Sequence, residues 1–304
     1  MSEVVEAGAG NGAGSGGRGN VLLTVLFRDV GARVGVAILA VVVFMAVLAP
    51  WISPYDPTEQ NILAGFQSPS VEHWFGTDEY GRDLLSRVIH GARPALMVGI
   101  LSVLVSLLIG APLGMLAGLK GGWVDLAVSA LVDVMMSFPS LLLALMIVTL
   151  VGSGLDVLVI AIGIAHVPIF IRVARGSTMQ LRGLDFIAAT RTFGAGDGWV
   201  IVQHVLPNIA GPLIVMASLG IAGAIRDEAA LSFLGLGIQP PDPSWGNIIR
   251  DGVNAILAAP WMPLISGFTL ALSVLAFNMI GDSVRDVLDP RDIAAATAEK
   301  GTNR

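Results

Sequence analysis

Six long apolar runs constrain the fold of this chain more than any other feature of its sequence. A helix needs about 20 residues to cross the hydrocarbon core of a bilayer, and each run has that length or comes close to it. The runs cover residues 34–52, 95–119, 126–151, 157–171 (extending to about 175), 209–234 and 261–281. They are continuous apolar blocks, whereas the strands of a membrane barrel alternate apolar and polar residues. The sequence therefore predicts an all-α polytopic membrane protein with six transmembrane helices.

The placement of lysine and arginine predicts the orientation of these spans. In a membrane chain this placement matters more than the net charge, which is −6 here. With the N-terminus inside, most of the cations fall on the cytoplasmic side: Arg18, Arg28, Arg33, Lys120, Arg172, Arg175, Arg182, Arg191, Arg285, Arg291, Lys300 and Arg304. Four fall outside, namely Arg82, Arg87, Arg93 and Arg250. This asymmetry predicts that both termini are cytoplasmic.

The chain divides into five parts along its length. Its first residues are rich in Gly, Ala, Ser and Asn and lack the charged start and cleavage site of a signal peptide, so we expect a disordered tail and a retained first span. The predicted parts are a tail (1–20), a cytoplasmic helix with the first span (21–53), an external loop (54–93), a core domain of five spans (94–284) and a cytoplasmic C-terminal tail (285–304).

The end of the external loop has the pattern of a capped amphipathic helix. We expect it to begin at Asp78, since Asp is a good N-cap. Apolar residues such as Leu84 and Val88 take one face. The opposite, polar face would consist of Arg82, Asp83, Ser86 and Arg87. Such a helix would lie along the outer membrane surface or fold over the mouth of a pathway.

The polar segment between the fourth and fifth apolar runs, residues 183–208, predicts two short amphipathic helices joined at a glycine. Phe186, Ala189 and Phe193 recur at helical spacing and form a narrow apolar stripe. Gly194 then breaks the helix, and Pro207 ends the second piece and starts the next span. This hinged segment has a suitable shape for a plug that another protein can push. An ordinary amphipathic connector at the membrane interface is the alternative.

Four charged residues lie inside the predicted spans, where a charge costs about 2.5–3.5 kcal/mol or more. They are Asp133, Arg226, Asp227 and Glu228. One hypothesis is that they face a pathway or a partner subunit and that a nearby carboxylate neutralises Arg226. The alternatives are a purely structural ion pair, or a fifth span that ends near Ala224 and leaves the charges in an external vestibule.

The second predicted span carries glycines at four-residue spacing. Gly110, Gly114 and Gly118 form a stripe that allows close helix packing, either within one subunit or in a dimer.

There is no cysteine, and the four histidines lack ligand spacing, so we predict no metal site. No nucleophile elbow or phosphate-binding Gly-x-x-x-x-Gly-Lys motif is present, so we predict no catalytic residue. We expect the cytoplasmic arginines to set the topology and contact lipid phosphate, and we predict no nucleic-acid role.

The hinged segment resembles the coupling loop of ABC-importer permeases, in which a Glu-Ala-Ala triplet precedes a glycine and an Ile/Val-x-x-x-Leu-Pro ending. The triplet position reads Ala188-Ala189-Thr190, followed by Gly194, Ala195 and Val205-Leu206-Pro207. Other stretches resemble the dipeptide/oligopeptide permease family, second permease subunit type: residues 75–87, 137–145, 230–241, 243–247 and 276–291. The resemblance covers about residues 30 to 292.

This resemblance implies the fold of a type I ABC importer permease in a bacterial cytoplasmic membrane. The implied partners are a second homologous permease, two ATP-binding subunits, an extracytoplasmic peptide-binding lipoprotein and membrane lipids. ATP and Mg would bind the partner ATPases, and this chain would hold no cofactor. The residues implied in ATPase coupling are Asp185, Phe186, Ala188, Ala189, Thr190, Arg191, Phe193, Gly194, Ala195, Leu206 and Pro207.

One departure from the family pattern and several rival functions remain open from the sequence. Ala188 stands where relatives have a carboxylate, so an ionic contact there is lost, while steric docking of the small-residue face can survive. Nickel-chelate and glutathione importers share the architecture, and these motifs do not separate their cargo from peptides. A secondary transporter or a membrane scaffold without transport are further alternatives.

Overall fold

The computed structural model describes residues 29–288. The predicted tail 1–20, most of the helix expected before the first span and the end of the C-terminal tail lie outside them. The described chain is helical and contains no strand, which agrees with the predicted fold class. Its helices are α2 (Val30–Ile52), η1 (Ile62–Ala64), α3 (Leu84–Lys120), α4 (Gly122–Met136), α5 (Ser140–Val151), α6 (Leu155–Arg182), α7 (Asp185–Thr192), α8 (Asp197–Val200), η2 (Ile201–Val205, π-helical), α9 (Leu206–Phe233), α10 (Trp245–Asn254) and α11 (Trp261–Leu288).

Five of the described helices are long and apolar enough to cross a membrane, and the number rises to six if one bent pair counts as a span. That pair is α4 and α5, which meet at an angle of 85°. The third predicted span, residues 126–151, is therefore wrong as a single straight helix. The reason lies in the connection, because Pro139 disfavours a helical conformation at Phe138 and cannot donate a backbone hydrogen bond.

The centre of the bundle is formed by α3 and α6, which pack closely along the glycine stripe of α3. A Cβ atom on Gly110 would lie 2.7 Å from the Cβ of Phe170, and one on Gly118 would lie 2.9 Å from the Cβ of Thr178. The stripe therefore serves packing within one subunit. The fourth predicted span corresponds to α6. Its uncharged stretch is the shortest of the six predicted spans. Even so, 67% of the most apolar 18 residues of α6 are buried in the bundle.

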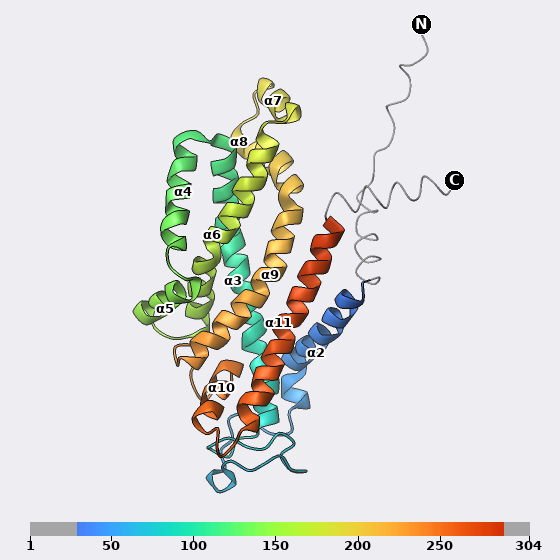
Figure 1. Ribbon diagram of the computed structural model, residues 1–304, viewed down its shortest axis with the longest axis vertical. Coiled ribbons are helices and arrows are strands. Elements are labelled where there is room, and N and C mark those ends of the chain that lie inside the picture. The colour runs from blue at the N-terminus through green and yellow to red at the C-terminus, as the bar shows by residue number, and fades with distance from the viewer. Residues whose placement is uncertain (1–28, 289–304) are drawn as a thin grey trace, which may run out of the picture.

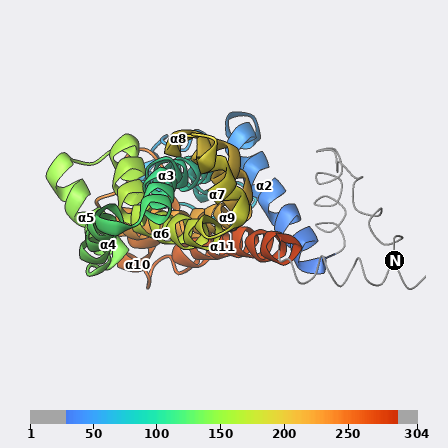
Figure 2. The same cartoon turned by 90° about the horizontal axis from the view of Figure 1, so that it is seen from above.

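The remaining helices surround this centre on two sides (Figure 1). On one side α11 and α2 pack together, and Gly35 of α2 lets the helices approach, since a Cβ there would lie 3.1 Å from the Cβ of Met279. On the other side lie α4 and α5, as the view along the bundle also shows (Figure 2). The hinged segment occupies one end of the bundle. The large loop, residues 53–83, occupies the opposite end beside α10.

The helix predicted from Asp78 at the end of the large loop does not exist as a separate element. The helix begins at Leu84, with Asp83 as its cap, and continues as the 37 residues of α3. The Asp83 carboxylate accepts a hydrogen bond from the backbone N–H of Ser86 at 2.8 Å. Arg82 and Arg87, expected on an outer polar face, are 3% and 2% exposed. They are buried because both lie against the carboxylate of Asp78.

Candidate functional site

The hinged segment folds as two short helices around a glycine, as its sequence predicts. The first, α7, ends at Thr192, and the second, α8, begins at Asp197. Gly194 between them has φ = 83°, in the left-handed region where a side chain is strained. The chain can therefore reverse sharply here because glycine has no Cβ, and α7 and α8 lie together at one end of the bundle (Figure 1).

The apolar stripe of the hinged segment is open to its surroundings. Phe186 is 41% exposed and Phe193 is 91% exposed, and Ala189 between them is exposed as well. In contrast, Ile187 and Val200 are 1% and 0% exposed and belong to the main core. The segment is thus fixed to the bundle on one face and presents aromatic side chains on the other.

Most of the other residues expected to take part in coupling are exposed too. Thr190 and Ala195 are half-buried, and the rest are exposed: Asp185, Ala188, Arg191, Gly194, Leu206 and Pro207. Thr190, Phe193, Ala195 and Trp199 line a hollow of about 480 Å³ on this face. The structure therefore places Thr190, Phe193, Gly194 and Ala195 of the predicted set around one hollow, together with Trp199, which was not in that set.

Polar and aromatic contacts with His204 hold the two helices together. The Thr190 hydroxyl and His204 Nε2 are 3.3 Å apart. The His204 ring makes edge contacts with Phe186 and Trp199, at centroid distances of 5.8 Å and 5.1 Å. Arg191 also donates to Asp197 at 3.2 Å. This role of His204 does not follow from the sequence alone, since His204 lies 14 residues from Thr190 and no short motif links them.

The second helix of the segment does not end at Pro207, contrary to the prediction. Residues Asp197–Phe233 form one continuous helical rod of 37 residues that includes α8, η2 and α9. The turn before the proline, Ile201–Val205, is π-helical, a local widening that occurs where the regular hydrogen-bond pattern is interrupted. The second half of the hinged segment, α8 with η2, and the fifth span are therefore parts of one continuous helix.

At the other end of this rod, three polar side chains from two helices meet. His166 of α6 donates from Nε2 to Asp227 Oδ2 over 3.0 Å, and both residues are buried. Arg226 Nε lies 3.6 Å from Asp227 Oδ1, but the Arg226 side chain is 68% exposed. The helix itself runs past Ala224 to Phe233, and the alternative in which these charges lie in an external vestibule stays a prediction.

The other two intramembrane charges lie apart from this group. Glu228 is fully buried, and its Oε1 accepts a hydrogen bond from the Ser232 hydroxyl at 2.8 Å. Asp133 of α4 accepts instead from Arg172 of α6 at 3.2 Å, and both side chains are more than half exposed. The four charges predicted as one set therefore occupy three environments.

The charged residues of the large loop form an internal scaffold. Asp78 Oδ2 accepts from Arg82 Nε at 2.6 Å and lies 3.4 Å from Arg87 Nε. Arg87 also donates to the backbone carbonyl of Pro57 at 2.9 Å, and His73 contacts Asp83 at 2.9 Å. Because Asp78, Arg82, Asp83 and Arg87 are buried and paired with one another or with nearby groups, they shape the loop.

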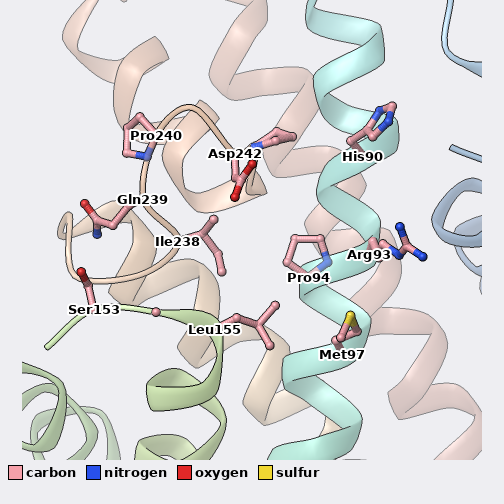
Figure 3. Close-up of a pocket in the computed structure, with 12 residues that line it drawn as sticks. His90, Arg93, Pro94, Met97, Ser153, Leu155, Ile238, Gln239, Pro240 and Asp242 are labelled. Atoms are coloured by element: carbon pink, nitrogen blue, oxygen red, sulfur yellow. The ribbon is translucent and has the colours of Figure 1, made fainter. Parts of the chain in front are cut away.

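A hollow of about 460 Å³ lies next to the large loop, between the start of α3, the turn before α6 and the segment that precedes α10. Figure 3 shows Ser153 and Gln239 on one side of it and Pro94 and Met97 of α3 on the other. His90, Arg93 and Asp242 add polar groups to its lining. This hollow does not follow from the sequence alone, because its walls come from three distant parts of the chain.

The chain is similar in sequence to known transport proteins. The family model for binding-protein-dependent transport system inner membrane components matches residues 110–292. A second model, the N-terminal TM domain of oligopeptide transport permease C, matches residues 22–69. The dipeptide transport system permease protein of Alkalihalophilus pseudofirmus is 45% identical over 260 residues, 86% of each chain. The glutathione transport system permease protein of Pectobacterium atrosepticum is 38% identical and covers 88% of both chains.

A solved structure supports the arrangement of the helices. A chain of the MetNI methionine ABC transporter, in an inward facing conformation, superposes with a TM-score of 0.57 and 19% identity. The match covers 68% of this chain and 98% of the other. At this identity the likeness concerns the fold, which is that of the membrane subunit of a type I ABC importer.

Proposed function

We propose that this chain, which belongs to the family of binding-protein-dependent transport system inner membrane components, is the permease subunit that carries short peptides in an ATP-driven importer. The family match and the apolar helices make it a multi-pass membrane permease. Peptide cargo is supported by the relative at 45% identity, a dipeptide transport system permease protein.

The observation that carries the proposal is the exposed aromatic stripe of the hinged segment at the end of a rigid rod. Two phenylalanines that point away from the core, Phe186 and Phe193, are suited to insertion into a groove of a partner. We assign this groove to an ATPase subunit, which would also hold the ATP and Mg. Such docking would supply force to this chain without any covalent chemistry on it.

The continuous helix formed by α8, η2 and α9 can transmit this force into the membrane. Because α8, η2 and α9 are continuous, a displacement that α7 passes on to α8 through their contacts with His204 would move the fifth span as one body. A change of that kind is a rigid-body switch between inward-open and outward-open states. In this proposal a second homologous permease supplies the other half of the pathway, and an extracytoplasmic lipoprotein delivers the peptide.

Docking of this chain would depend on shape more than on charge. Ala188 is exposed on α7 and carries no carboxylate, whereas the neighbouring Ala189 and the two phenylalanines provide a small apolar face. Arg191 is held by Asp197 and is already partly neutralised. We therefore expect the affinity between this chain and its ATPase to depend weakly on salt.

The proposal is tested with the complete importer in proteoliposomes. Uptake of a labelled dipeptide should require ATP and the binding protein, and should persist when a proton ionophore collapses the proton gradient at constant ATP. Phe193→Ala should lower uptake while its membrane abundance stays normal. Uptake that is driven by a proton gradient without ATP would contradict the proposal and favour a secondary transporter.

Glutathione is a second candidate cargo, because a glutathione permease is 38% identical to this chain. Glutathione is itself a short peptide, so the same pathway could serve both. Competition separates the two cargoes: unlabelled dipeptides should block uptake of a labelled dipeptide, and glutathione should block it only at much higher concentration. The opposite order would assign glutathione as the cargo.

A further inference from the structure

Arg226 stands out because it is a largely exposed cation on a helix that crosses the membrane. Its exposed fraction is 68%, whereas its neighbours Asp227 and Glu228 are 5% and 0% exposed. Phe233, where α9 ends, is seven residues further on, a distance of about 10 Å along the axis. A cation on a membrane-spanning helix needs an anionic or polar partner wherever it faces the hydrocarbon core, since the core offers none.

The neighbouring residue, Asp227, is only a partial anionic partner for Arg226. One carboxylate oxygen of Asp227 is taken by His166 at 3.0 Å. The other lies 3.6 Å from the Nε atom of Arg226, which is longer than a hydrogen bond. Within residues 29–288 the Arg226 side chain makes no hydrogen bond. Its guanidinium therefore keeps its donors free, in a fork that fits a carboxylate bidentately.

A hollow of about 250 Å³ adjoins this guanidinium. Beside Arg226 it is lined by the polar His166 and Asn278 and by apolar side chains such as Phe170 and Met216. Gly223, one turn before Arg226, leaves it open, since a Cβ there would lie 3.6 Å from His166 and 4.0 Å from the Arg226 Nη2 atom. The hollow thus combines a cation, polar groups and an apolar wall, which together match an amino acid residue with a free carboxylate.

We propose that Arg226 and this hollow form a subsite for the terminal carboxylate of a peptide in transit, an inference that rests on the proposed function. Short peptides differ in their side chains, but each ends in a carboxylate, so one arginine can serve a varied cargo. Asp227, which is itself held by His166, lies 3.6 Å from the Arg226 Nε atom and attracts it by charge. The subsite lies on the same continuous helix as α8, so a displacement of α8 would reach the cargo.

The test uses the complete importer in lipid nanodiscs without its binding protein, whose own selectivity would otherwise mask that of the membrane subunits. Binding of alanyl-phenylalanine and of its C-terminal amide is measured by saturation-transfer NMR. Wild type should bind the free acid about tenfold more tightly than the amide, the scale of one charge-assisted hydrogen bond. Arg226→Gln should abolish this preference, and Arg226→Lys should keep part of it.

Two further variants distinguish loss of the subsite from a folding defect. Gly223→Leu leaves every charge in place and fills the hollow, so it should weaken binding of acid and amide alike. Arg33→Gln removes another exposed arginine, from the first turn of α2, and should behave as wild type. Each variant is accepted once membrane abundance and basal ATPase activity match wild type.

Three outcomes would overturn the subsite. Wild type could show no preference for the acid, or Arg226→Gln could retain it. A third is that Arg226→Gln lowers uptake only in anionic lipid while the preference persists, which would assign the arginine to a lipid headgroup. If wild type imports the dipeptide in proteoliposomes but shows no preference, only the subsite fails. If it imports no peptide at all, the proposed function fails.

Discussion

At the scale of single residues, Gly114 decides how closely α3 and α6 can approach. A Cβ atom there would lie 2.8 Å from the Cβ of Ala174 and would press on the backbone of Ile171. We expect Gly114→Ala to destabilise the chain by about 1–3 kcal/mol, because overpacking outweighs the better helix propensity of alanine. Gly176→Ala is the matched control, since its Cβ meets nothing within 4 Å. Tryptophan-fluorescence melting measures both, and equal melting temperatures would contradict the packing argument.

A second residue, Asp29, ties the start of α2 to the end of α11. Its pKa is lowered first by the Ser283 hydroxyl, which donates to its carboxylate, and then by the backbone N–H groups of Gly31 and Ala32. A carboxyl with a lowered pKa stabilises the fold above its unfolded pKa, near 4, and loses this effect as the pH falls through the folded value.

This sign predicts the pH dependence of an Asp29→Ala variant. At pH 7 it should melt below wild type, because the cap and the link to Ser283 are both lost. The gap should narrow below about pH 4, where protonation weakens the same contacts in wild type. Glu59→Ala, which removes an exposed carboxylate from the large loop, is the matched control. A gap for Asp29→Ala that stays constant down to pH 3 would refute the assignment.

At the scale of elements, the reversal between α7 and α8 depends on Gly194. Since φ is 83° and a Cβ there would meet nothing within 4 Å, any cost of a side chain comes from backbone strain, about 1–2 kcal/mol. Gly194→Val should therefore displace α7 and lower peptide uptake at least several-fold, with ATP hydrolysis retained. Gly198→Ala, in the helical α8, is the control. Normal uptake in Gly194→Val would mean that the hinge angle does not matter for coupling.

The elements also show which features of the fold are local enough to read from sequence. The spans and the two helices around Gly194 follow from runs and breaks of a few residues. The right angle between α4 and α5 does not, because hydropathy over residues 126–151 is insensitive to direction, although Pro139 is a signal of a break. The joining of the loop helix to α3 was missed for a related reason. Arg82 and Arg87 read as a solvated face, but Asp78 neutralises them in the interior.

The two candidate sites, the hinged segment and the hollow beside Arg226, also differ in how far they can be predicted from the sequence. The exposed stripe of the hinged segment lies on one short helix, so its spacing alone identifies it. The contact between His166 and Asp227 joins residues 61 apart in the chain, and it exists only because α6 packs against α9. No short motif carries that information, and the hollow beside Arg226 has walls from both helices and α11.

At the scale of the whole molecule, the separation of the large loop from the hinged segment predicts their sides of the membrane. Lys120, Arg182 and Arg191 are exposed at the hinged end. At the large-loop end, Arg82 and Arg87 are buried against Asp78 and contribute little free charge. The burial of these two arginines makes the excess of free cations at the hinged end larger than a count of residues suggests. That end should therefore be cytoplasmic.

Because the chain has no cysteine, single cysteines test this orientation directly. Leu63→Cys, at a position 98% exposed in the large loop, should react with a membrane-impermeant maleimide in intact spheroplasts. Thr192→Cys, exposed on the hinged segment, should react only after the membrane is permeabilised, and the cysteine-free parent should not react at all. The reverse pattern would invert the molecule in the membrane. Reaction of both positions in intact spheroplasts would contradict their placement on opposite sides, and with it the path by which ATPase subunits in the cytoplasm could drive the fifth span.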